Sequence, residues 1–108
     1  MHLIERVEFH SPLEERDRLG GRKPRWNSEF PTRAAFQYLR GGEKVLAGRI
    51  AGTQTLIATI RKSDLSDGVE NSWMMLDRAT GKEYAIRGIE PNRDKPRQYL
   101  DILCETVT

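Results

Sequence analysis

The sequence predicts a small all-β protein, an antiparallel barrel or sandwich of about six strands with long loops and one short helix. Its 108 residues suffice for one domain with a modest core, so residues 1–108 are expected to form a single domain. Short runs of alternating polar and apolar residues recur along the chain, separated by glycine, proline and charged residues. The predicted strands are residues 4–9, 26–39, 54–60, 73–77, 83–89 and 99–107.

The first predicted strand places Val7 and Phe9 on its apolar face. Pro12 is expected to end it, because proline lacks the N–H that a ladder needs. Residues 11–25 then combine mixed charge with glycines and a proline, which predicts a long mobile loop. In an isolated subunit we expect this loop to be poorly ordered.

The second predicted strand is the longest extended segment, and Pro31 within it predicts a bend or an edge position. At period two, four side chains share its apolar face: Phe30, Ala34, Phe36 and Tyr38. Gly41-Gly42 ends this strand, and residues 43–51 have helical character because Leu46 and Ile50 are four apart. Residues 40–53 are therefore predicted to hold one to two turns of helix.

The third predicted strand alternates, with Leu56, Ala58 and Ile60 on one face. Residues 61–68 are predicted to be a polar loop. Residues 79–82 form a tight connection that makes a hairpin of the next two strands, and residues 90–97 form a second charged loop.

Charge and cysteine content exclude several classes of protein. The net charge is only +2, from 18 basic and 16 acidic side chains that largely alternate, whereas proteins that grip DNA carry a stronger imbalance. Cys104, the single cysteine, can form no intrachain disulfide, and it is expected to be a buried, inert thiol. No apolar run reaches the length of a membrane span, and the N-terminus lacks the apolar core of a secretory signal.

The sequence holds no recognisable catalytic or cofactor site. His2 and His10 lie near the N-terminus, outside any acid–base pattern, and are expected to be solvated. Asp64 and Asp67 lack the spacing and the later glutamate of a calcium loop. Gly41-Gly42 is followed by Glu43-Lys44 rather than by the end of a phosphate loop. We therefore expect a protein that is not an enzyme and that has no metal or cofactor.

Two basic clusters remain, and acidic neighbours dilute both. Solvated or subunit-interface charge is the favoured interpretation, with phosphate binding as the alternative. The clusters are Arg16, Arg18, Arg22, Lys23 and Arg25 in the first, and Arg93, Lys95 and Arg97 in the second.

The order and spacing of several short motifs resemble the head-tail joining proteins of tailed bacteriophages, also called head completion, connector or stopper proteins. The resemblance covers nearly the whole chain, although each motif alone is weak, and Lys62 stands where the family often has an aromatic residue. The motifs are Arg6-Val7-Glu8-Phe9, the loop with Trp26, the segment that leads to Glu43, Ile60-Arg61, Gly81-Lys82-Glu83-Tyr84-Ala85-Ile86 and Leu100-Asp101-Ile102-Leu103-Cys104-Glu105.

This resemblance implies a structural protein of the virion neck, made in the host cytoplasm. Copies would form a cyclic homo-oligomer of about six or twelve subunits between the portal or adaptor ring and the tail terminator or tail tube. Genomic DNA would pass through without sequence-specific binding, and in some members a loop closes the channel and retains the genome. The channel-side segment would be residues 40–53, with Arg40, Gly41, Gly42, Glu43, Lys44, Arg49 and Gly52.

The alternative function is a small nucleic-acid-binding barrel of the oligonucleotide-binding type. Its stacking platforms would come from Trp26, Phe36, Tyr38 or Trp73, and single strands would contact Arg22, Lys23 and Arg25. These aromatic residues are better explained as part of the core.

Overall fold

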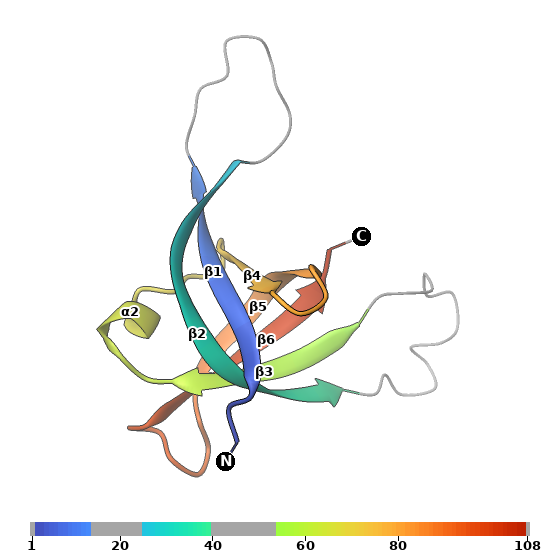
Figure 1. The fold of residues 1–108 in the computed structure, drawn as a ribbon. Coiled ribbons are helices and arrows are strands. Elements are labelled where there is room, and N and C mark those ends of the chain that lie inside the picture. Colours follow the sequence, from blue (N-terminus) through green and yellow to red (C-terminus); the bar gives the residue numbers. More distant parts are fainter. Residues whose placement is uncertain (1, 14–24, 40–53, 108) are drawn as a thin grey trace, which may run out of the picture.

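The computed structural model describes residues 2–13, 25–39 and 54–107. Its six strands form one closed antiparallel barrel in the order β1-β2-β3-β6-β5-β4, with β4 paired back onto β1 (Figure 1). The predicted fold class is therefore confirmed, and the barrel form is the correct one of the two proposed. The strands are β1 (Glu5–Leu13), β2 (Arg25–Leu39), β3 (Thr55–Arg61), β4 (Met74–Asp77), β5 (Glu83–Pro91) and β6 (Tyr99–Thr106).

The core fills the barrel with one face of each strand. Val7 and Phe9 of β1 are fully buried, and Phe9 stacks on Phe30 of β2 with ring centroids 5.3 Å apart. The predicted apolar face of β3 is confirmed, because its three members are also fully buried. The rest of the core comes mainly from Ala34, Met75, Tyr84, Ile86, Leu100, Ile102 and Cys104, with Phe36 and Trp73 packed against it.

β1 and β2 both extend further than the sequence indicated. β1 continues through Pro12 to Leu13, and β2 begins at Arg25, so the predicted loop was too long at both ends. Pro12 is tolerated because β4 pairs with β1 only at residues 7–10, which leaves an edge of β1 without a strand partner among the described residues. Residues 14–24 lie outside the described part of the chain.

The distal part of this strand pair rises out of the barrel as a two-stranded ribbon (Figure 1). We call residues 11–13 and 25–27 the ribbon; its pairs are Ser11 with Asn27, Pro12 with Trp26 and Leu13 with Arg25. Pro31 has the predicted edge position, because β3 pairs with β2 only at residues 34–39 among the described residues. The bulge in this strand pair lies two residues before it. The register shifts after Phe9, so that Glu29 has no partner residue and forms a bulge.

A one-turn helix, α2 (Asp64–Asp67), stands where the sequence predicted only a polar loop. A reciprocal capping box forms it: the Ser63 hydroxyl accepts from Ser66 N, and the Ser66 hydroxyl accepts from Ser63 N. This box was not predicted from the sequence, because serine replaces the usual glutamate. The predicted helix at residues 43–51 lies outside the described residues. Within the described residues, no helix is long and apolar enough to cross a membrane.

The predicted hairpin between β4 and β5 is confirmed. Asp77, buried at the end of β4, accepts hydrogen bonds from Ala79 N and from the Thr80 hydroxyl, both at 3.0 Å. Gly81 closes the turn at a φ of 78° and donates its N–H to Asp77 O at 2.7 Å. That conformation suits glycine, because a Cβ there would strain the backbone.

Candidate functional site

Four arginines occupy neighbouring register positions from the end of β4 across β1 and β2 to the end of β3. Arg6 of β1 is directly opposite Arg33 of β2. One step beyond the Ala34–Ile60 pair, the register places Arg33 opposite Arg61 of β3. Arg78, just after β4, donates its backbone N–H to Arg6 O at 2.9 Å. We call Arg78, Arg6, Arg33 and Arg61 the arginine row.

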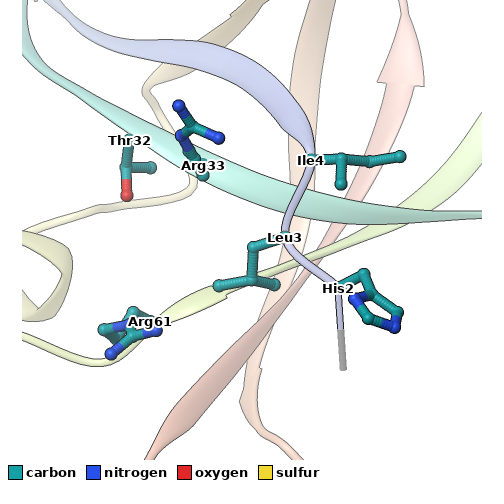
Figure 2. Close-up of a pocket in the computed structure, with 6 residues that line it drawn as sticks. All are labelled: His2, Leu3, Ile4, Thr32, Arg33 and Arg61. Atoms are coloured by element: carbon teal, nitrogen blue, oxygen red, sulfur yellow. The ribbon is translucent and has the colours of Figure 1, made fainter.

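The row lines two hollows that share Thr32 and Arg33. Figure 2 shows the larger hollow, where the segment of residues 2–4 runs beside β2, with Arg33 on β2 and Arg61 at the end of β3 among its lining residues. Ile4, at 70% exposure, contributes an apolar wall. The smaller hollow lies between Arg6, Arg33 and Arg78. Both hollows have arginines in their lining, and Leu3 and Ile4 add apolar groups to the larger one.

Glu8 shares with Arg6 the face of β1 that points away from the core, and its carboxylate is already engaged. Oε2 accepts from Arg78 Nη1 at 3.2 Å, and Oε1 accepts from the Ser28 hydroxyl at 3.3 Å. His10 Nε2 lies 3.3 Å from the same Oε1. Among the described residues, no carboxylate forms an ion pair with Arg6, Arg33 or Arg61. Three of the four charges in the row are therefore not neutralised within this part of the chain.

The β5–β6 loop is held by a half-buried polar network. Asp101 accepts from the Thr59 hydroxyl at 2.7 Å and from Asn92 Nδ2 at 3.1 Å. Asn92 Oδ1 in turn accepts from the backbone N–H groups of Asp94 and Lys95, at 3.1 and 2.9 Å. This arrangement fixes the loop that carries Arg93, Lys95 and Arg97, which are all exposed.

The ribbon is fastened by its own bulge residue. The Glu29 carboxylate accepts hydrogen bonds from the Ser11 hydroxyl and from Asn27 Nδ2, the latter at 3.0 Å. These bonds hold the pKa of Glu29 below its usual value of 4.5, and the bond from Ser11 has the larger effect. An irregularity in the ladder is thus used to join the two strands where they leave the barrel.

The remaining predicted site residues fall in three places. Arg25 opens β2 on the ribbon and is exposed. The loop cations of residues 93–97 are brought together as described, but the structure does not test their predicted assembly role. The others lie outside the described residues: Arg16, Arg18, Arg22, Lys23, Arg40, Gly41, Gly42, Glu43, Lys44, Arg49 and Gly52.

The arginine row was not predicted from the sequence, because its members are distributed along the chain from Arg6 to Arg78. Only the strand register shows that they are neighbours. Both histidines were predicted from the sequence to be solvated. His2 is exposed. The prediction for His10 is wrong, because its side chain is only 15% exposed and lies beside Glu8.

The buried ionisable groups are inert. Cys104 is fully buried, as predicted, and burial raises the pKa of its thiol to about 12. Burial likewise raises the pKa of Tyr84 to about 12. Among the described residues, no group of three or more histidines, cysteines or carboxylates could hold a metal ion.

A model of the family described as phage head completion protein matches residues 1–107. The chain belongs to this family. The family that the sequence motifs indicated is thereby confirmed, and so is the predicted location in the virion. A head completion protein has a structural role at the junction of head and tail, and its partners are other head and tail proteins. Because the family is one of structural phage proteins, it points away from an enzyme.

Two solved structures share the fold. The solution structure of protein SF1141 from Shigella flexneri 2a is 20% identical, has a TM-score of 0.66, and matches 96% of this chain and 92% of its own. A chain in the virion of a native gene transfer agent particle is 16% identical, has a TM-score of 0.68, and matches 99% of this chain and 97% of its own. None of the curated proteins compared with the chain matches it.

Proposed function

We propose that copies of this head completion protein form a ring in the virion neck, between the portal or adaptor ring of the filled head and the tail. We also propose that the ring helps to retain the genome. One observation beyond the family supports the ring: the edge of β1 at residues 11–13 has no strand partner on its β4 side among the described residues. Such edges are templates for pairing with another chain.

Ring closure needs a heterologous contact that repeats from one copy to the next. The ribbon supplies one side of that contact in our proposal, and the fixed β5–β6 loop supplies exposed charge for the other. Exposed Leu13 on the ribbon, at 43% exposure, gives it an apolar element to bury. In this arrangement residues 40–53 face the channel, and DNA passes without sequence-specific binding.

The structural context also favours assembly over nucleic-acid stacking as the function. Phe36 and Trp73 pack against the core, as expected, rather than forming an open platform. Tyr38 is exposed, but it contacts Phe36 edge-on, with ring centroids 6.1 Å apart. Two of the four aromatic residues considered for stacking are thus committed to the barrel.

Deleting the gene from the phage tests the proposal. Electron microscopy of the lysate should show full-length tails detached from heads that have lost DNA, and supplying the protein in trans should restore joined particles. Nuclease treatment of purified heads, with and without added protein, measures genome retention separately. Normal yields of joined, infectious particles without the chain would refute the neck role.

A charge-reversed β5–β6 loop tests the loop in particular. Changing Arg93, Lys95 and Arg97 to glutamate should leave the barrel folded, because all three are exposed, but should lower the yield of joined particles. Lys82→Glu is a matched control, since Lys82 is an exposed cation in the β4–β5 turn. Equal yields from the loop variant and the control would remove this loop from the interface.

A further inference from the structure

We propose that the arginine row is a docking surface for an acidic, partly apolar segment of another neck protein. This inference rests on the proposed function, because it names the chemistry of one partner contact in the neck. It uses a surface away from the ribbon, and its Arg61 end adjoins the β5–β6 loop, because Arg61 pairs with Tyr99. Three features of the described residues carry it: uncompensated charge, spacing and an apolar wall.

The first feature is the uncompensated charge of the row. Like charges directly opposite each other on neighbouring strands repel, and Arg6 and Arg33 occupy such a pair. Arg61 adds a third charge one strand further on, and Glu8 is engaged with Arg78 instead. An anionic partner would relieve this repulsion, so the free chain carries a cost that docking removes.

The second feature is the spacing of the row. Neighbouring strands lie about 4.8 Å apart, so four arginines across four strands span roughly 15 Å. Carboxylates that recur on one face of a helix, three or four residues apart, are about 5–6 Å from one another. Because the barrel is closed, this path follows a curved wall, so one acidic segment can face two neighbouring members of the row, such as Arg6 with Arg33 or Arg33 with Arg61. Arginine binds carboxylates with two parallel hydrogen bonds.

The third feature separates a protein partner from DNA. Ile4, 70% exposed, lines the same hollow as Arg33 and Arg61, and Leu3 lines it beside them. A phosphate backbone has no apolar group to cover these side chains, whereas a protein segment does. The chain's net charge of only +2 also gives little of the general attraction on which DNA binding depends.

A binding measurement on the purified chain separates the two classes of partner. The probes are a short glutamate-rich peptide with one leucine and a short duplex DNA, each followed by fluorescence anisotropy. The wild-type chain should bind the peptide about tenfold more tightly than Arg33→Glu does. Lys82→Glu should match the wild type, and duplex DNA should bind the wild type and Arg33→Glu equally. Equal peptide affinity for the wild type and Arg33→Glu would overturn the proposal, and so would a loss confined to DNA.

An assembly measurement distinguishes the failure of this inference from that of the proposed function. Phage that carry Arg33→Glu should accumulate unjoined heads and tails, and suppressor mutations should change an acidic residue of another neck protein to lysine or arginine. If the deletion blocks joining but Arg33→Glu joins normally, the docking surface is refuted and the neck role stands. If the deletion itself joins normally, the neck role is the part that fails.

Discussion

Arg6 lies directly opposite Arg33 in the β1–β2 ladder, and both side chains are exposed. The pair is unfavourable for folding, because two like charges face each other across neighbouring strands. A small barrel has little stability to spare. In our proposal, an acidic partner in the virion relieves this conflict.

Reversing one of these charges should stabilise the free chain. In Arg33→Glu, the new carboxylate faces Arg6 on one side and Arg61 on the other, and the free energy of unfolding should rise by about 0.2–1 kcal/mol. Urea unfolding at low salt measures the change, and high salt should reduce it because the pair is exposed to solvent. A destabilised variant would show that the two arginines do not repel each other in the native barrel.

Two glycines should differ in their tolerance of alanine. Gly81 has a φ of 78°, so Gly81→Ala should cost about 1–2 kcal/mol of unfolding free energy. Gly88 is the control, because an added Cβ would meet Leu103 Cβ at an ordinary 3.7 Å. Gly88→Ala should change stability by less than about 0.5 kcal/mol. Equal costs for the two variants, measured by thermal unfolding, would contradict the turn geometry.

Asn92 should fix the β5–β6 loop. Asn92→Ala removes a hydrogen bond to Asp101 and two to the loop backbone, which should cost about 1–3 kcal/mol and should speed hydrogen exchange at Asp94 and Lys95. Arg93→Ala is the control, since its side chain is exposed. Unchanged exchange in Asn92→Ala would mean that the loop is ordered by other contacts.

Alkaline pH should destabilise the barrel. The pKa of the Cys104 thiol is about 12 in the folded chain, against an ordinary value of 9.0, so the folded chain holds this proton where the unfolded chain has lost it. The contribution of this thiol to the free energy of unfolding is fully present below pH 9 and is lost as pH rises toward 12. Tyr84 acts in the same direction between 10 and about 12.

The test of this pH dependence is the slope of stability against pH, because substitutions in the core also change absolute stability. The variant with Cys104→Ala and Tyr84→Phe should lose stability less steeply than the wild type across the alkaline range, as followed by urea midpoints. Identical slopes would show that neither group titrates differently in the folded chain.

Glu29 should give the ribbon its own dependence on acid. The pKa of Glu29 lies below 4.5 in the folded chain. Its contribution to the stability of the ribbon is therefore present above pH 4.5 and is lost as pH falls through the folded pKa. Hydrogen exchange of residues 11–13 and 25–27 should therefore quicken in acid before the barrel opens. Glu29→Gln should show faster exchange in the ribbon already at neutral pH. Unaltered exchange there would indicate that the backbone ladder alone holds the ribbon.

Much of the barrel could be predicted because alternation reports burial directly. Leu56, Ala58 and Ile60 alternate with polar residues, and all three are fully buried. The ends of the elements were harder to predict. Pro12 predicts the end of a strand, yet β1 continues through it to Leu13. Proline is tolerated there because the short β4 pairs with β1 only at residues 7–10 and leaves the edge of β1 beside Pro12 without a strand partner among the described residues. Local sequence holds no information on the length of a distant neighbour.

The arginine row shows the same limit for the site. Arg6, Arg33, Arg61 and Arg78 lie far apart in sequence, and each has acidic or apolar neighbours that hide it from a composition scan. They become a surface only once four strands are set in register. The loop cations at residues 93–97, by contrast, are close in sequence and were found at once.

The most direct test of the account is a cryo-electron microscopy reconstruction of the neck in joined particles. The account predicts a ring of copies of this chain between the portal or adaptor ring and the tail, with acidic side chains of a neighbouring protein against Arg6, Arg33 and Arg61. A joined neck without this chain, or a ring whose arginine row faces only solvent or DNA, would contradict it.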